Sequence, residues 1–193
     1  MPINPLRVLR GDSLLLVVDV QERLAPAIAD RDAILARTLA LVSFAARVGV
    51  PVLATEHAPE RIGPLVAPLR ERLAPEAILH KTRFCAADEP AFSSWLATRR
   101  RGTIVLAGME SHVCVLQTAL ELRRLGHAVA VAADATGSRA VRAEERRWAL
   151  ERMREAGCAI AGTETILFEW TGGADDRAFR EALALVKALP DGG

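Results

Sequence analysis

One local pattern recurs four times in this chain and restricts its possible folds more than any other feature. In each copy, a polar or basic helix end reaches a glycine, and an apolar segment follows at once. Glycine suits this position because the residue after the last helical turn commonly has a positive φ, which is costly for other residues. The glycines are Gly49, Gly102, Gly126 and Gly157. The pattern predicts helices and strands in alternation.

The apolar segments lack the polar alternation of a strand that has one face in water. Strands that are apolar throughout are typical of parallel sheets, in which helices cover both faces. We therefore predict a three-layer α/β/α Rossmann-like domain. Strands are predicted near 14–19, 51–55, 77–80, 103–107, 127–132 and 158–161, and helices near 32–48, 89–100, 113–125, 142–156 and 175–188. The proline-rich segment 59–75 is predicted to be a loop with one short helix.

Composition limits the class of protein. A length of 193 residues predicts a single domain over residues 1–193, and 51% hydrophobic with 25% charged residues predicts a globular chain. A net charge of +1 argues against binding nucleic acid through phosphate contacts. No apolar run approaches the ~20 residues of a membrane span, and the early one ends at Asp19. Three widely spaced cysteines imply no disulfide framework, so a cytoplasmic location is expected.

Polar residues gather where the predicted strands end. In open parallel sheets, ligands bind beyond the carboxyl ends of the strands, near the point where the strand order reverses. These strand ends are therefore the place to look for a site. The polar or reactive residues there are Asp19, Glu56, His57, Lys81, Cys114 and Asp134.

Cys114 is the strongest candidate for a nucleophile. It follows a short apolar strand and a tight polar turn, at the point where an apolar helix is predicted to begin. A thiol there faces the positive end of the helix macrodipole, and a helix start together with a nearby cation can lower its pKa. The alternative is a buried structural thiol.

A carboxylate and a lysine complete a usable set with this thiol. Asp19 would take the thiol proton and later pass it to the leaving group, while Lys81 would favour the negative charges. Backbone N–H groups of the turn can bind the developing oxyanion. Two further candidates are His112, as a partner for Cys114, and Cys85, as a residue of the pocket wall.

The same residues resemble the isochorismatase-like cysteine hydrolase superfamily. The resemblance lies in Asp19 after the first strand, Lys81 after the third, and the run Gly108-Met-Glu-Ser-His-Val-Cys114-Val. The runs Thr55-Glu-His-Ala-Pro and Ala133-Asp-Ala-Thr-Gly-Ser-Arg139 resemble its isochorismatase-domain branch of unassigned function. The resemblance covers roughly residues 12–170.

This resemblance implies a catalytic triad of Asp19, Lys81 and Cys114, on a six-stranded parallel sheet ordered 3-2-1-4-5-6. It also implies a cis peptide bond between Met109 and Glu110. The backbone N–H groups of Glu110 and Cys114 would then form the oxyanion hole. The family forms oligomers, commonly dimers or tetramers, so a homo-oligomer is expected.

Two departures within the superfamily narrow the expected chemistry. Nicotinamidases carry an Asp-x-His metal motif near the second strand, whereas this chain has Thr55-Glu56-His57 and no further histidine before His80. We therefore predict neither a metal nor another cofactor. Some isochorismatases lack the cysteine and cleave a vinyl ether. The presence of Cys114 favours hydrolysis of an amide or a related C–N bond.

The sequence thus predicts a cysteine hydrolase that acts on a small molecule through a thioester. One alternative is an isochorismatase-type vinyl-ether hydrolase with Asp19 as the acid, and another is an interaction protein that keeps the fold. A nucleotide-dependent oxidoreductase is disfavoured because no Gly-x-Gly-x-x-Gly follows the first strand. The residues expected to contact substrate are Glu56, His57, Arg83, Phe84 and Arg139.

Overall fold

The six strands form one parallel sheet in the order β3-β2-β1-β4-β5-β6. The computed structural model describes residues 7–190. The strands are β1 (Ser13–Val18), β2 (Val52–His57), β3 (Ile78–Lys81), β4 (Thr103–Met109), β5 (Ala128–Gly137) and β6 (Ala159–Ala161). Both the predicted fold class and the strand order implied by the family resemblance are confirmed.

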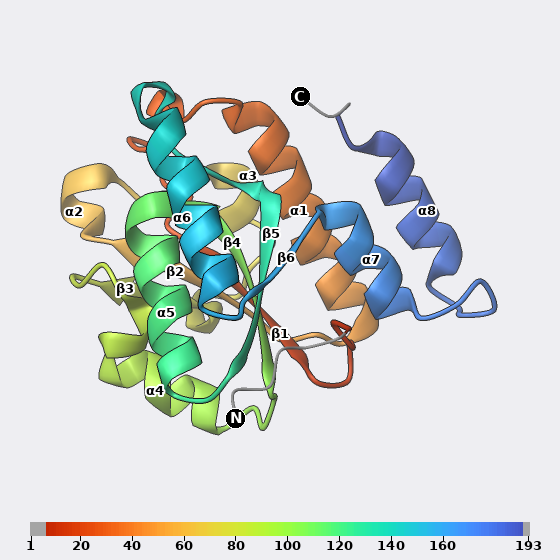
Figure 1. Ribbon diagram of the computed structural model, residues 1–193. Helices are drawn as coiled ribbons and strands as arrows, with labels where there is room; N and C mark the ends of the chain where they lie inside the picture. The colour runs from red at the N-terminus through yellow and green to blue at the C-terminus, as the bar shows by residue number, and fades with distance from the viewer. Residues whose placement is uncertain (1–6, 191–193) are drawn as a thin grey trace.

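Helices cover both faces of the sheet (Figure 1). One face carries α1 (Arg31–Val48), α7 (Thr163–Thr171) and α8 (Phe179–Ala188), and the other carries α4 (Pro90–Ala97), α5 (Leu116–Arg124) and α6 (Ala143–Glu155). The connecting segments hold α2 (Pro59–Ile62), α3 (Ala67–Arg70), η1 (Ala25–Ala27), η2 (Pro75–Ala77), η3 (Ala86–Asp88), η4 (Ser111–Val115) and η5 (Ala140–Arg142). None of the helices within residues 7–190 is long and apolar enough to cross a membrane.

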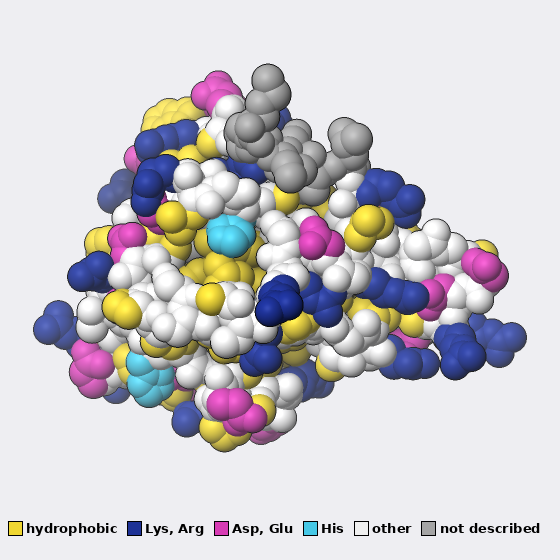
Figure 2. Space-filling model, turned by 90° about the horizontal axis from the view of Figure 1, so that it is seen from below, with side chains coloured by type: hydrophobic (Ala, Val, Ile, Leu, Met, Phe, Trp, Pro, Cys, Tyr) yellow, Lys and Arg dark blue, Asp and Glu magenta, His cyan; other side chains and the backbone are white. Residues whose placement is uncertain are grey.

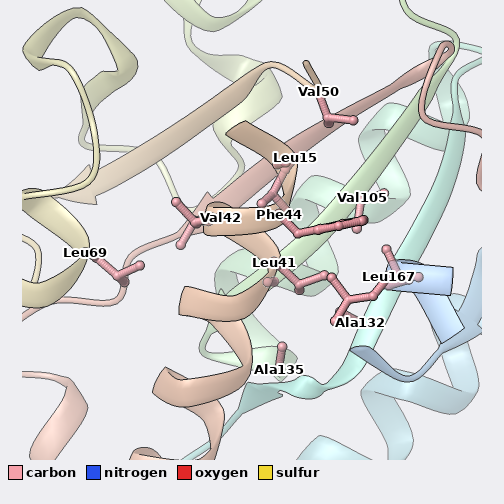
Figure 3. Close-up of a cluster of buried hydrophobic side chains, with 14 of the residues drawn as sticks. Leu15, Leu41, Val42, Phe44, Val50, Leu69, Val105, Ala132, Ala135 and Leu167 are labelled. Carbon is pink, nitrogen blue, oxygen red and sulfur yellow. The ribbon is translucent and has the colours of Figure 1, made fainter. Parts of the chain in front are cut away.

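Two hydrophobic clusters, one on each face of the sheet, make up the core. Figure 3 shows part of the first, where Phe44 and Leu41 of α1 pack beside strand residues such as Val105. The second lies under α4, α5 and α6 and includes Cys114. β1 is buried at all six positions because it is central in the sheet and covered on both sides. This double burial explains its unbroken apolar sequence.

Three of the four predicted glycine caps have the expected backbone geometry. Gly49, Gly126 and Gly157 have φ values of 74°, 91° and 84°. Gly102 differs, because the left-handed residue after α4 is Arg100, with a φ of 48°. Gly102 is instead held by a side chain: its N–H donates to Asp12 Oδ1 at 2.8 Å.

Other differences from the predicted elements lie mainly in the second half of the chain. Helix α7 was not predicted, and β5 runs on to Gly137 beyond a register shift against β4. Segment 59–75 holds two short helices, α2 and α3, rather than one. All three features lie outside the stretches of strong apolar periodicity on which the prediction depended.

Candidate active site

Asp19 lies immediately after β1 and is almost fully buried, with 1% of its surface exposed. Its φ of 51° places it in the left-handed region, which aspartate tolerates better than most residues. Its backbone N–H donates to the Thr55 carbonyl at 3.1 Å, and Thr55 Oγ1 donates to Asp19 Oδ1 at 2.6 Å. The end of β2 therefore fixes both the backbone and one oxygen of this carboxylate.

Lys81 pairs with the other oxygen of Asp19. Its Nζ lies 2.7 Å from Asp19 Oδ2, and both side chains are shielded from solvent. Nζ also donates to the carbonyls of Arg83 and Phe84, at 3.1 and 3.2 Å. A buried ammonium needs such partners because an uncompensated buried charge is costly.

Cys114 completes the cluster from the start of the helical segment that follows β4. It lies in η4, a π-helical turn that leads directly into α5, and it is 6% exposed. Its thiol is within hydrogen-bonding reach of both Asp19 and Lys81. The structure thus brings the three predicted residues together, from three different strand ends.

The protonation of this thiol differs from the sequence-based expectation. Burial raises the pKa of Cys114 well above its ordinary value, and the Asp19 carboxylate raises it further. Lys81 lowers this pKa but does not outweigh the other two effects. The resting group is therefore a neutral thiol at physiological pH, and the helix start alone does not make it a thiolate. A base must accept its proton during the reaction.

The turn before Cys114 is held at Glu110. The peptide bond between Met109 and Glu110 is cis, at the position that the resemblance implies. The Glu110 carbonyl accepts from the N–H groups of Val113 and Val115, at 3.1 and 3.2 Å. The oxyanion role of the Glu110 and Cys114 N–H groups stays a prediction.

Gly108 permits this turn to lie close to β1. Its φ is +120°, a value that side chains other than hydrogen rarely allow. A Cβ there would lie 2.6 Å from the backbone nitrogen of Val18, directly against the central strand. Any larger residue would therefore push β4 away from β1, and with it the turn that carries Cys114.

Three of the predicted substrate residues lie around Lys81. His57 pairs with Lys81 across β2 and β3, and its ring stacks on Phe84 with 5.3 Å between the ring centroids. Phe84 is half-exposed, so this stack marks the rim of the cluster. The Arg83 side chain points elsewhere: its guanidinium donates to the Asp88 carbonyl at 3.0 Å.

The other two predicted substrate residues have protein partners. Glu56 is next to Thr55 on β2, and successive strand residues point to opposite faces. Its carboxylate accepts from Leu65 N–H at 2.8 Å and lies 3.0 Å from His80 Nε2. These contacts occupy Glu56 and place it apart from the triad. Arg139 Nε donates to Glu110 at 3.0 Å, on the other side of the turn.

The remaining candidate residues bind or pack against other parts of the protein. His112 Nδ1 lies 2.9 Å from Ser138 Oγ, and Asp134 accepts from the N–H and hydroxyl of Thr163 at the start of α7. Cys85 packs in the same hydrophobic cluster as Cys114, and burial raises the pKa of its thiol. Burial also raises the pKa of Cys158 to about 11.

Sequence reasoning missed two residues that support the site. Thr55 carries a hydroxyl group in a buried strand. A polar side chain at such a position was the sequence signal that could have identified it. Gln21 is fully buried two residues after Asp19. Its Nε2 donates to the carbonyls of His57 and Gly63, at 3.0 and 2.6 Å, and its Oε1 accepts from His57 N–H at 2.7 Å. Gln21 thereby joins the ends of β1 and β2.

The donor set near the triad does not resemble a metal centre. Among residues 7–190, no group of three or more His, Cys, Asp or Glu side chains is arranged to hold a metal ion. His57 faces the aromatic ring of Phe84 rather than another ligand. The Asp19 carboxylate is already engaged by Thr55 and Lys81.

Comparison with known proteins decides the family. Residues 13–165 match the isochorismatase domain. This chain belongs to the isochorismatase family of hydrolases. The match includes the sheet and all three residues of the predicted triad.

Relatives of the chain align over nearly its whole length. It is 32% identical to isochorismatase domain-containing protein 2A of Mus musculus over 189 residues, which is 97% of this chain and 89% of the relative. A solved structure of the MAR1 ribonuclease from Caenorhabditis elegans is similar at 33% identity with a TM-score of 0.88, covering 97% of this chain and 96% of the other. YcaC from Pseudomonas aeruginosa, solved with hexane-2,5-diol and covalent acrylamide, is similar at 26% identity with a TM-score of 0.85, covering 95% and 93%.

Proposed function

We propose that this isochorismatase-family protein is a metal-independent cysteine hydrolase of a small amide or related C–N substrate. The observation that carries the proposal is the buried pair of Asp19 and Lys81, 2.7 Å apart, with the Cys114 thiol in reach of both. This combination provides a nucleophile, a base and a cation at one point. Two strained or unusual backbone features, the positive φ of Asp19 and the π-helical turn, also lie there.

The proposed reaction has two steps. Cys114 Sγ attacks the carbonyl carbon while Asp19 accepts the thiol proton, and the C–N bond breaks as Asp19 returns that proton to the leaving amine. Water then attacks the thioester, giving the acid and restoring the thiol. Lys81 stabilises the Asp19 carboxylate and the developing thiolate, and the N–H groups of Glu110 and Cys114 stabilise the oxyanion.

Burial of the triad favours a small substrate. Asp19, Lys81 and Cys114 are 1%, 2% and 6% exposed, so only a compact acyl group can reach Sγ. Figure 2 shows the opposite side of the molecule, at the amino ends of the strands and away from the triad, where both basic and acidic side chains are present. The burial of the three triad residues supports a small molecule rather than RNA as the substrate, although one structural relative is a ribonuclease.

A substrate panel tests the proposal. The purified protein is incubated, with and without EDTA, with p-nitroacetanilide, an N-carbamoyl amino acid, isochorismate and a single-stranded RNA oligomer. We expect hydrolysis of an amide or carbamoyl substrate at a rate that EDTA leaves unchanged. Turnover of isochorismate alone would support the vinyl-ether alternative, cleavage of RNA alone would support a ribonuclease, and loss of amidase activity in EDTA would contradict the metal-free mechanism.

We also propose that the protein acts in the cytoplasm as a homo-oligomer. Val141 of η5 and Trp148 of α6 are large hydrophobic residues that are 80% and 50% exposed. Burying such side chains between copies would remove apolar surface from water. Light scattering at micromolar concentration should therefore give two or four times the 20.8 kDa chain mass. A stable monomer would contradict this prediction.

A further inference from the structure

We propose that Arg139 is a positioning residue: acting through Glu110, it holds the turn that carries Cys114 in the geometry that acyl transfer requires. The inference rests on the proposed cysteine-hydrolase function. It assigns to Arg139 a role different from the substrate contact predicted from the sequence.

The first support is the contact itself. The Glu110 side chain is only 10% exposed, and its Oε1 accepts from both the backbone N–H and the Nε of Arg139, at 3.1 and 3.0 Å. A carboxylate with so little solvent contact depends on such charge-assisted hydrogen bonds. Arg139 is therefore the partner that satisfies Glu110.

The second support comes from the backbone of Glu110. Its carbonyl accepts from the N–H groups of Val113 and Val115, the two residues that flank Cys114. One residue thus contacts Arg139 through its side chain and the nucleophile's turn through its backbone. Its own N–H is one of the two proposed oxyanion donors, so a shift of Glu110 would displace donor and nucleophile together.

A second side-chain contact, between His112 and Ser138, joins the same two segments. His112 Nδ1 lies 2.9 Å from Ser138 Oγ, so two consecutive residues after β5 hold two residues of the turn after β4. The segment that provides these contacts is itself anchored. Ala29 N–H donates to the Ser138 carbonyl at 3.0 Å, and Ile28 forms a β-bridge with Arg139. Arg139 can therefore act as a fixed support.

The effect of a displaced turn depends on the reaction. In acylation by p-nitrophenyl acetate, Sγ bonds to the carbonyl carbon, the thiol proton passes to Asp19, the carbonyl oxygen becomes negative, and p-nitrophenolate leaves. In alkylation by iodoacetamide, Sγ bonds to the methylene carbon and iodide leaves, with the same proton transfer but no oxyanion. A residue that positions the oxyanion donors should affect the first reaction far more than the second.

The experiment measures both reactions on Cys114 in three variants. Arg139→Gln removes the charged donor, Arg139→Lys keeps the charge without the planar fork, and Arg147→Gln is a matched control. Arg147 also forms ion pairs, with Glu144 and Glu151, but on the exposed side of α6. Acylation and alkylation rates are taken from the p-nitrophenolate burst and from the labelled peptide in mass spectrometry.

For Arg139→Gln we expect acylation to slow about 10-fold and alkylation to change less than about twofold. Arg139→Lys should recover part of the acylation rate, and Arg147→Gln should match the original protein in both reactions. Equal losses in both reactions, no loss in either, or a loss of melting temperature that accounts for the change would overturn the positioning role. A weaker apparent affinity for the ester at an unchanged limiting rate would instead return Arg139 to substrate contact.

Failure of this inference and failure of the proposed function give different results. If the unaltered protein is not acylated at Cys114, the proposed hydrolase function is wrong, and the positioning role ends with it. If the unaltered protein is acylated and Arg139→Gln is acylated equally fast, only the positioning role is wrong.

Discussion

Replacing Cys114 with alanine should reduce hydrolysis of the best amide substrate by at least ~10⁴-fold, because the reaction loses the atom that forms the thioester. Folding should change little, since alanine removes only the sulfur from a site that is already packed. The turnover number and the unfolding free energy of the purified variant check both statements. Trapping of an acyl group at residue 114 in the unaltered protein, seen as a mass increase, would identify the intermediate.

A matched control separates the role of this thiol from that of cysteine in general. Cys158 is also buried in the hydrophobic cluster below α6, but it lies just before the amino end of the edge strand β6, whereas Cys114 follows the carboxyl end of β4. Cys158→Ala should keep activity within about threefold. An active Cys114→Ala variant would contradict the thioester mechanism and favour the vinyl-ether alternative, in which Asp19 acts as the acid without a nucleophilic sulfur.

The architecture was predictable because its central strands are buried on both faces. A strand such as Leu14 to Val18 has no solvent-facing position, so its unbroken apolar sequence predicted a parallel sheet and, with it, the edge where the site lies. Helix α7 was not predictable in the same way. It contains three threonines, an isoleucine and two aromatic residues, which are weak helix formers, and its packing against α1 provides what propensity does not.

The site was predictable only in part, for a related reason. Asp19, Lys81 and Cys114 stand at strand ends, where the topology brings side chains together. The partners of those residues depend on the direction of each side chain. Thr55 and Glu56 are neighbours in the sequence, yet Thr55 supports Asp19 while Glu56 binds Leu65 and His80. The high pKa of Cys114 likewise depends on burial, which the helix-start argument did not include.

Replacing Lys81 with methionine should have the second largest effect, because it removes a charge from a pair that water does not reach. Lys81 and Asp19 have side-chain exposures of 0% and 1%. Without Lys81, the Asp19 carboxylate is left buried and unpaired, so we expect a loss of about 3–5 kcal/mol in unfolding free energy. Turnover should fall by ~100-fold or more, the scale of one lost electrostatic stabiliser.

The same variant should shift the reactivity of the thiol in a defined direction. Lys81 lowers the pKa of Cys114, so its removal should raise that pKa and move the rise of iodoacetamide alkylation with pH to higher pH. An Asp19→Asn, Lys81→Met double variant distinguishes charge from packing. Because it leaves no unpaired charge, it should regain much of the lost stability, yet it should stay inactive because it has no base. If alkylation of Lys81→Met depends on pH as it does in the unaltered protein, Lys81 has no role in the mechanism. If the double variant is active, Asp19 has no role either.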